Sequence, residues 1–234
     1  NDYRQWAREA VDASPPGVSQ QKPWEDFLAS LHYVRRVSDS KRSFGNLKSR
    51  LEQIDREISA GGNYMFFLAV PPSAFKDSAE GLQSVGLNSE ESGGWRRILV
   101  EKPFGEDLAS ARQLNSALLG IFREEQIYRI DHYLGKETVQ NLLVFRFANQ
   151  FIEPLLNSRY VDSVQITVAE SLGVEKRGGF YDRVGAMRDI IQNHALQLLS
   201  MICMEPPACL DPESVRDEKL KVFRAVRRMS PADV

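Results

Sequence analysis

Apolar and polar positions follow helical spacing in some segments of the chain and strand-like runs in others. Residues 45–59 place apolar side chains three and four positions apart, which predicts an amphipathic helix that ends at Gly61-Gly62. The unbroken apolar run YMFFLAV at 64–70 comes directly before two prolines. Such a run is typical of a strand buried on both faces of a parallel sheet.

The rhythm of strand and helix then repeats. Residues 73–85 predict a helix, RRILVE at 96–101 predicts a second buried strand, and 107–122 predicts a helix that Asp107 caps. The short segment QIYRI adds a further strand. Strand, crossover helix and strand form a βαβ unit. The predicted fold class is therefore α/β, with a partial, Rossmann-like, doubly wound coenzyme domain.

Beyond residue 131 the pattern changes. The sequence predicts a helix at 136–148, an alternating strand at 160–168 and a long helix at 181–204. We expect this part to begin an α+β domain with an antiparallel sheet. The predicted domains are residues 1–130 and 131–234.

Composition narrows the classes of partner. The formal charge is only −2, so no basic field is available for nucleic acid or an anionic membrane. No apolar run approaches the ~20 residues that a membrane helix needs. Cys203 and Cys209 provide no disulfide framework, and no histidine has metal-ligand spacing. We expect a soluble cytoplasmic protein without a metal site.

Two predicted strands end at prolines. Pro71-Pro72 follows the first, and Lys102-Pro103 follows the second. Open α/β sheets bind ligands beyond the carboxyl ends of their strands, so a cofactor is expected there. Lys102 would be held where its ammonium reaches phosphate or hydroxyl groups. The alternative is that the prolines merely end strands.

The segment RIDHYLGKE at 129–137 concentrates polar side chains around one glycine. Its basic residues offer donors for a cluster of phosphate oxygens, whereas the carboxylate of Asp131 would repel phosphate. Asp131 is therefore expected to orient a histidine ring. The alternative is a solvated polar loop that precedes a helix.

The helix predicted at 185–202 is apolar almost all round but carries an arc of polar residues. On it, His194 is a candidate general base and Asp189 a candidate acceptor for sugar-like hydroxyls. The alternative is a satisfied core histidine. Glu170, at the end of the strand predicted at 160–168, is a second candidate acceptor or simply a solvent-facing residue.

Six motifs, in order and spacing, strongly resemble the glucose-6-phosphate dehydrogenase family. They are EKPFG (101–105), RIDHYLGKE (129–137), RFAN (146–149), RGGFYD (177–182), RDIIQNH (188–194) and MEPP (204–207). The resemblance runs from about residue 60 to residue 234. It implies oxidation of glucose 6-phosphate to 6-phosphogluconolactone, with hydride transfer from C1 to NADP, the first step of the oxidative pentose phosphate pathway. It also implies a homodimer or homotetramer.

The resemblance assigns roles residue by residue. His194 would take the proton of the C1 hydroxyl, and Asp131 would orient its ring. The 6-phosphate would be held by His132, Tyr133 and Lys136. The sugar site would be lined by Glu170, Arg177 and Asp189. Lys102 would lie between sugar and coenzyme, before a proline with a cis peptide bond, with Pro71 and Pro72 on the coenzyme side.

The sequence departs from the family in two ways. The glycine-rich phosphate turn that opens the family's coenzyme domain is missing from these 234 residues, and the family's chain continues further. We therefore expect an internal segment, inactive by itself, whose contacts to a 2′-phosphate lie upstream. Two other readings are another sugar oxidoreductase with the same E-K-P strand end and a non-catalytic sugar-phosphate-binding or subunit-interaction protein.

Overall fold

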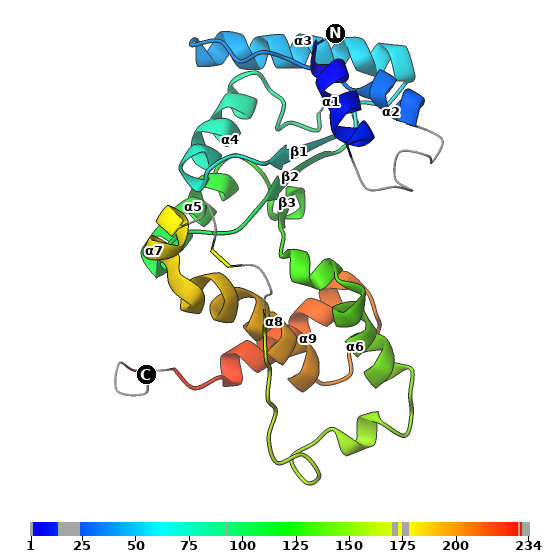
Figure 1. The fold of residues 1–234 in the computed structure, drawn as a ribbon, viewed down its shortest axis with the longest axis vertical. Helices are drawn as coiled ribbons and strands as arrows, with labels where there is room; N and C mark the ends of the chain where they lie inside the picture. The colour runs from blue at the N-terminus through cyan, green and yellow to red at the C-terminus, as the bar shows by residue number, and fades with distance from the viewer. Residues whose placement is uncertain are drawn as a thin grey trace. The chain divides into compact units, whose positions relative to one another are not determined.

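The structure is a computed structural model that describes residues 2–13, 24–91, 93–169, 173–174, 178–228 and 230, without the side chains of Phe180 and Arg183. It divides into two compact units (Figure 1). Unit 1 comprises Asn1–Phe67, Ser73–Ile98 and Ala117–Ile127, and unit 2 comprises Leu68–Pro72, Leu99–Ser116 and Tyr128–Val234. Each unit is described by itself.

Helices make up most of unit 1. They are α1 (Asp2–Asp12), α2 (Trp24–Ser30), α3 (Ser40–Ile58) and α4 (Phe75–Ser84). Asp39 caps α3 by accepting a hydrogen bond from the backbone N–H of Arg42, which confirms the helix predicted at 45–59 and extends its start. α3 packs against α4, where a Cβ on Gly81 would overlap the ring of Phe44, so a larger residue there would require that ring to move.

A parallel three-stranded sheet connects these helices, in the order β1 (Tyr64–Leu68), β2 (Arg96–Val100), β3 (Ile127–Arg129). The strands and the crossovers through α4 and α5 (Leu108–Leu119) confirm the predicted α/β class. Asp107 caps α5 as predicted, because its Oδ1 accepts from the N–H of Ser110 at 2.7 Å.

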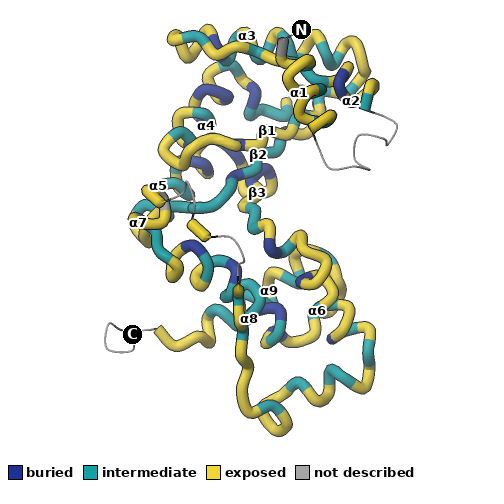
Figure 2. The backbone as a smooth tube through the Cα atoms, in the orientation of Figure 1, coloured by how far each residue is buried: buried dark blue, intermediate teal, exposed yellow. Residues whose placement is uncertain are grey.

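The central strand is the one with the buried side chains. Ile98 and Val100 are almost fully buried on β2, whereas Met65 and Phe67 on the edge strand β1 are 58% and 53% exposed. The expectation that the first strand is buried on both faces was therefore wrong. Figure 2 shows buried backbone around β2 and along α4. Those core residues of unit 1 include Phe75, Ala79, Leu82, Ile98, Leu118 and Phe122.

Unit 2 continues from the carboxyl ends of the strands into short and long helices. They are η3 (His132–Gly135), α6 (Glu137–Phe147), η4 (Glu153–Leu155), α7 (Gly178–Ala186), η6 (Met187–Ala195), α8 (Leu196–Cys203) and α9 (Pro212–Ala225). α8 packs against both α6 and α9. Two single turns lie elsewhere: η1 (Pro72–Ala74) spans the boundary between the units, and η2 (Glu124–Gln126) belongs to unit 1.

The long helix predicted at 181–204 is three helical pieces. Gly185 interrupts α7 with a φ of 68°, a conformation that favours glycine. The following segment, η6, is a π-helix, and α8 resumes α-helical geometry. The correction matters for the candidate site, because a π-helix aligns residues five apart along the chain.

The strand predicted at 160–168 is not formed, and the described residues do not confirm an antiparallel sheet. Residues 161–169 carry no strand assignment, and Figure 1 draws them without an arrow. A strand needs a neighbour for its backbone hydrogen bonds. Among the described residues after 169, the regular elements are helices, which offer no such edge.

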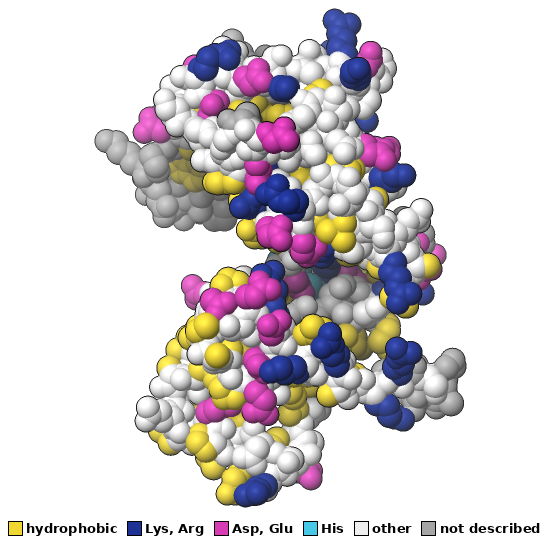
Figure 3. Space-filling view, turned by 180° about the vertical axis from the view of Figure 1, so that it is seen from behind, with side chains coloured by type: hydrophobic (Ala, Val, Ile, Leu, Met, Phe, Trp, Pro, Cys, Tyr) yellow, Lys and Arg dark blue, Asp and Glu magenta, His cyan; other side chains and the backbone are white. Residues whose placement is uncertain are grey.

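The described surface carries both signs of charge. On the face shown in Figure 3, Lys and Arg side chains are interspersed with Asp and Glu. Within the described residues, no helix is long and apolar enough to cross a membrane.

Candidate active site

Four side chains of unit 2 form a continuous line of polar contacts. The Nζ of Lys102 lies 3.0 Å from Oδ1 of Asp189 and 2.6 Å from Nε2 of His194. On the other side of the ring, Nδ1 of His194 lies 2.6 Å from Oδ1 of Asp131. The structure thus brings together the histidine and the carboxylate that the sequence predicted as partners.

Local backbone structure positions each of these groups. Lys102 lies two residues past the end of β2, and its peptide bond to Pro103 is cis. Asp131 caps η3, because its Oδ1 also accepts from the N–H of Tyr133 at 3.0 Å. Asp189 and His194 are five residues apart on η6, so the π-helical spacing allows both to reach Lys102.

The contacts define the tautomer of His194. A lysine ammonium can only donate a hydrogen bond, and an ionised carboxylate can only accept one. Lys102 therefore donates to Nε2, and Nδ1–H donates to Asp131. This arrangement leaves a neutral imidazole whose Nε2 lone pair is directed to a cation.

Burial and charge hold His194 in that neutral form. Its side chain is fully buried, and desolvation is the main cause that lowers its pKa from 6.5, followed by the positive charge of Lys102. Asp131 opposes this effect and raises the pKa. A deprotonated imidazole near neutral pH can accept a proton, which a base must do.

Aromatic rings enclose the imidazole. Tyr133 is buried and stacks on His194 at 3.9 Å between centroids, with 11° between the planes. His132 meets His194 edge to face at 4.8 Å. Lys136 places its Nζ 3.5 Å from the centroid of the Tyr133 ring. The proposed phosphate ligands are thus grouped around the proposed base, with His132 and Lys136 both exposed.

Three groups in this cluster offer one metal-ligand atom each within 4.8 Å of one another, namely Asp131, His132 and His194. Both ring nitrogens of His194 are already engaged, one by the carboxylate and one by Lys102. The geometry is therefore that of a hydrogen-bonded dyad beside a cation, rather than that of ligands around one ion.

The remaining predicted site residues divide into two groups. Pro71 and Pro72 are exposed, just past the end of β1. Glu170 and Arg177 lie outside the described residues.

The expected polar arc on the helix is only partly present. Asp189 and His194 are buried and share Lys102, but the Nδ2 of Asn193 donates to the carbonyl of Arg188 on its own helix. The arc assumed α-helical spacing, and the π-helical segment replaces that spacing.

The sequence analysis assigned no role to two basic residues of unit 2. Arg146 is buried and donates to both carboxylate oxygens of Glu153, at 3.0 and 2.6 Å, and to the carbonyls of Met201 and Met204. Lys219 lies half-buried on α9, where burial lowers its pKa and the charge of Asp131 raises it. The cap at Asp211-Pro212 indicates the start of α9 in the sequence, but no sequence pattern indicates this influence of Asp131.

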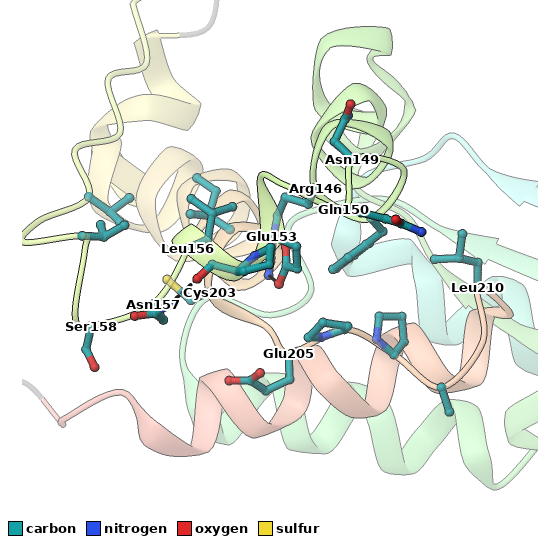
Figure 4. A pocket seen from close by; sticks show the side chains of 18 of the residues that line it. Arg146, Asn149, Gln150, Glu153, Leu156, Asn157, Ser158, Cys203, Glu205 and Leu210 are labelled. Carbon is teal, nitrogen blue, oxygen red and sulfur yellow. Dashed lines mark hydrogen bonds and ion pairs between the residues drawn. The ribbon is translucent and has the colours of Figure 1, made fainter.

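A cavity of 1100 Å³ in unit 2 is separate from this cluster. Figure 4 shows its walls, which come from the end of α6, from residues 149–164 and from residues 202–210. The charged groups of Arg146 and Glu153 on its wall already bind each other. The cavity contains none of the predicted site residues.

Comparison with known proteins places the chain in a family. The model described as "Glucose-6-phosphate dehydrogenase, NAD binding domain" matches residues 1–141, and "Glucose-6-phosphate dehydrogenase, C-terminal domain" matches residues 143–234. "Glucose-6-phosphate 1-dehydrogenase 2" of Mycobacterium tuberculosis (strain ATCC 25618 / H37Rv) is 45% identical over 99% of this chain and 45% of its own length. "Glucose-6-phosphate 1-dehydrogenase" of Rhizobium meliloti is 46% identical over 100% of this chain and 46% of its own length.

Solved structures agree with the sequence matches. One, described as "Glucose-6-phosphate dehydrogenase in complex with its substrate glucose-6-phosphate", aligns with a TM-score of 0.85 at 41% identity, over 96% of this chain and 46% of that one. The Mycobacterium avium enzyme aligns with a TM-score of 0.81 at 36% identity, over 99% of this chain and 48% of that one. The chain spans about half the length of the relatives it matches. It belongs to the glucose-6-phosphate dehydrogenase family.

Proposed function

We propose that the protein containing this chain oxidises glucose 6-phosphate to 6-phosphogluconolactone. The observation that carries the proposal is the 2.6 Å contact between Asp131 and a buried His194, in a chain of this family. A solved relative is described as a complex with glucose 6-phosphate. The reaction would be the first step of the oxidative pentose phosphate pathway.

His194 supplies the base. Its Nε2 carries the lone pair in the tautomer that the contacts define, so Nε2 accepts the proton of the C1 hydroxyl. The imidazolium that forms is stabilised by Asp131 through Nδ1–H. Lys102 contacts Nε2, and we infer that the sugar hydroxyl replaces this contact while Lys102 remains beside it.

The other proposed substrate ligands bind rather than react. His132, Tyr133 and Lys136 hold the 6-phosphate, because their N–H, O–H and ammonium groups donate to phosphate oxygens. Asp189 accepts from sugar hydroxyls, and Glu170 and Arg177 are assigned to the sugar site by their place in the family motifs.

The family model implies a nicotinamide cofactor, and the carboxyl ends of the strands in the parallel sheet fit one. Pro71 and Pro72 after β1 and Lys102 after β2 would lie against it. When bound, this cofactor supplies a hydride acceptor for C1. We propose NADP rather than NAD, as implied by the family resemblance.

The setting of the enzyme follows the family resemblance. We propose a cytoplasmic homodimer or homotetramer whose small-molecule partner is glucose 6-phosphate, without a nucleic-acid or membrane partner. The net charge of −2 supports the last point. An Arabidopsis thaliana relative, 45% identical over 93% of this chain, is named as cytoplasmic.

A direct absorbance assay tests the proposal. The protein is supplied with glucose 6-phosphate and either NADP or NAD, and nicotinamide reduction is followed. We expect reduction with glucose 6-phosphate, a higher kcat/KM with NADP, and far lower kcat/KM with free glucose. No reduction with either coenzyme, together with measurable glucose 6-phosphate binding, would instead support a non-catalytic sugar-phosphate-binding protein.

A further inference from the structure

The two carboxylate oxygens of Asp131 differ in their hydrogen bonds. Oδ1 accepts from the backbone N–H of Tyr133 at 3.0 Å and from Nδ1 of His194 at 2.6 Å. Oδ2 is buried and has no hydrogen-bond partner among the described residues. A buried carboxylate oxygen without a donor is costly, by about 1–3 kcal/mol or more for a charged group. A cation near Oδ2 would remove that cost.

Lys219 is the candidate for that cation, because the charge of Asp131 acts on it. It lies half-buried on α9, which packs against α8, the helix that continues directly from the one bearing His194. Within the described part of the chain, no hydrogen bond or ion pair engages its ammonium, and the charge that acts on it is that of Asp131. Burial lowers its pKa, and Asp131 counteracts that effect.

The other charged groups around the dyad already have contacts of their own. Lys102 faces Nε2 of His194 and Asp189, on the side of the ring opposite Asp131. His132 packs edge to face on the His194 ring. Lys219 differs from these groups because the charge that acts on it is that of Asp131, which lies on the Nδ1 side of the ring.

We propose that Lys219 is a positioning residue that pairs through its ammonium with Oδ2 of Asp131 and so holds the plane of the carboxylate against His194. The inference rests on the proposed role of His194 as base. Lys219 acts on His194 through Asp131.

The pairing has a defined electrostatic consequence. Without the ammonium, the carboxylate of Asp131 loses a stabilising charge. The pKa of His194 rises, because a positive charge that opposes the imidazolium is gone. This change moves the acid limb of the activity profile to higher pH. A lysine that only packed its stem against α8 would not produce it.

Variants of α9 separate charge from packing. Lys219→Met keeps an apolar stem and removes the charge, and Lys219→Arg keeps the charge. Lys221→Met is the matched control, because Lys221 is two-thirds exposed on the same helix and pairs with Glu218. The measurements are the pH profile of kcat/KM for glucose 6-phosphate with NADP, and an NMR titration of His194 in the same proteins.

For Lys219→Met we expect kcat to fall by about 10-fold, with little change in KM, and the acid limb to move up by about half a pH unit or more. Lys219→Arg should restore the limb, and Lys221→Met should match the wild type. An unchanged limb and an unchanged His194 titration in Lys219→Met would overturn the inference. A wild-type protein without activity would overturn only the proposed function, because the NMR titration still reports the pairing.

Discussion

At the scale of single residues, His194 combines two opposing requirements. Burial and Lys102 lower the pKa of its imidazole, whereas Asp131 raises it. A base must be neutral before the reaction and must tolerate a proton during it. The first two effects meet the first requirement, and the contact of Nδ1 with Asp131 meets the second.

Replacing His194 by Asn should remove the base but retain a polar side chain. We expect kcat to fall by about 10² to 10⁴-fold, the usual contribution of a positioned base, while KM for glucose 6-phosphate changes little. Asp131→Asn should cost less, because the imidazole remains. The control is His32→Asn, since His32 belongs to unit 1 and contacts Arg50. Near wild-type turnover in His194→Asn would assign the base to another group.

The pH profile offers a second check on the same residue. The pKa of His194 lies below 6.5 in the folded protein, so the base becomes protonated only as the pH falls below that value. The kcat/KM profile, which reports the free enzyme, should lose activity on the acid side below about pH 6.5. A His194→Asn protein should lack this limb. An acid limb of unchanged position in that variant would show that another group titrates.

Lys136 should affect binding more than chemistry. Phosphate contacts exist both before and during hydride transfer, so truncating Lys136 to Met should raise KM for glucose 6-phosphate with a smaller change in kcat. Free glucose has no phosphate and serves as the control substrate. Steady-state kinetics with both substrates measure the difference. An equal loss for both substrates would contradict a phosphate contact.

At the scale of elements, the sequence predicted what depends on local patterns. Apolar spacing indicated α3, apolar spacing and the cap at Asp107 indicated α5, and apolar runs indicated β1 and β2. The motif at 129–137 placed Asp131 as the partner of a histidine. These features depend on residues that are neighbours in sequence or belong to a repeated strand and helix pattern.

What the sequence did not predict depends on long-range structure. No residue pattern distinguishes the π-helix of η6 from an α-helix, so the shared contact of Asp189 and His194 with Lys102 could not be derived from spacing. The strand at 160–168 has the correct alternation but lacks a neighbour among the described residues. In the sequence, Lys219 resembles any lysine of an amphipathic helix. Only the tertiary structure shows that the charge of Asp131 acts on it.

Glu90 joins three elements of unit 1. Its carboxylate accepts from the N–H of Arg96 at 2.7 Å and from the guanidinium of Arg97 at 2.7 Å, and it pairs with Arg123 beyond α5. The bond from the Arg96 N–H is the largest cause that lowers its pKa to about 2, and both guanidinium groups add to it. The carboxylate therefore connects β2 to the loop before it, which carries Glu90, and to the loop after α5, which carries Arg123.

The contacts of Glu90 should contribute measurably to the free energy of unfolding. Glu90→Gln should lower the free energy of unfolding at neutral pH by about 1–3 kcal/mol, because charged partners lose their acceptor. The folded pKa lies below the unfolded value of 4.5, so the contribution is present above about pH 4.5 and is lost as the pH falls toward about 2. Urea unfolding at several pH values measures it, with the exposed neighbour variant Glu91→Gln as control. A deficit that persists undiminished at low pH would exclude the charge as its cause.

At the scale of the whole molecule, the division into two units separates the chemistry from most of the sheet. Every described candidate for the base and the phosphate site belongs to unit 2, including Lys102, which follows β2. Unit 1 contributes helices and the first parts of the strands. Binding of the sugar phosphate should therefore stabilise the two units unequally.

Hydrogen exchange with and without glucose 6-phosphate tests this difference. A ligand that binds only the folded state stabilises it, by about 2.7 kcal/mol at a concentration 100 times its Kd, and this slows exchange wherever exchange requires opening of the bound site. We expect slower exchange in residues 129–140 and 187–196, which carry the proposed phosphate ligands and the base. Residues 40–58, in α3 of unit 1, should change little. Free glucose at the same concentration should protect both unit 2 segments less, because it lacks the phosphate that His132 and Lys136 are proposed to bind. Protection of α3 without protection of the unit 2 segments would place the substrate away from His194.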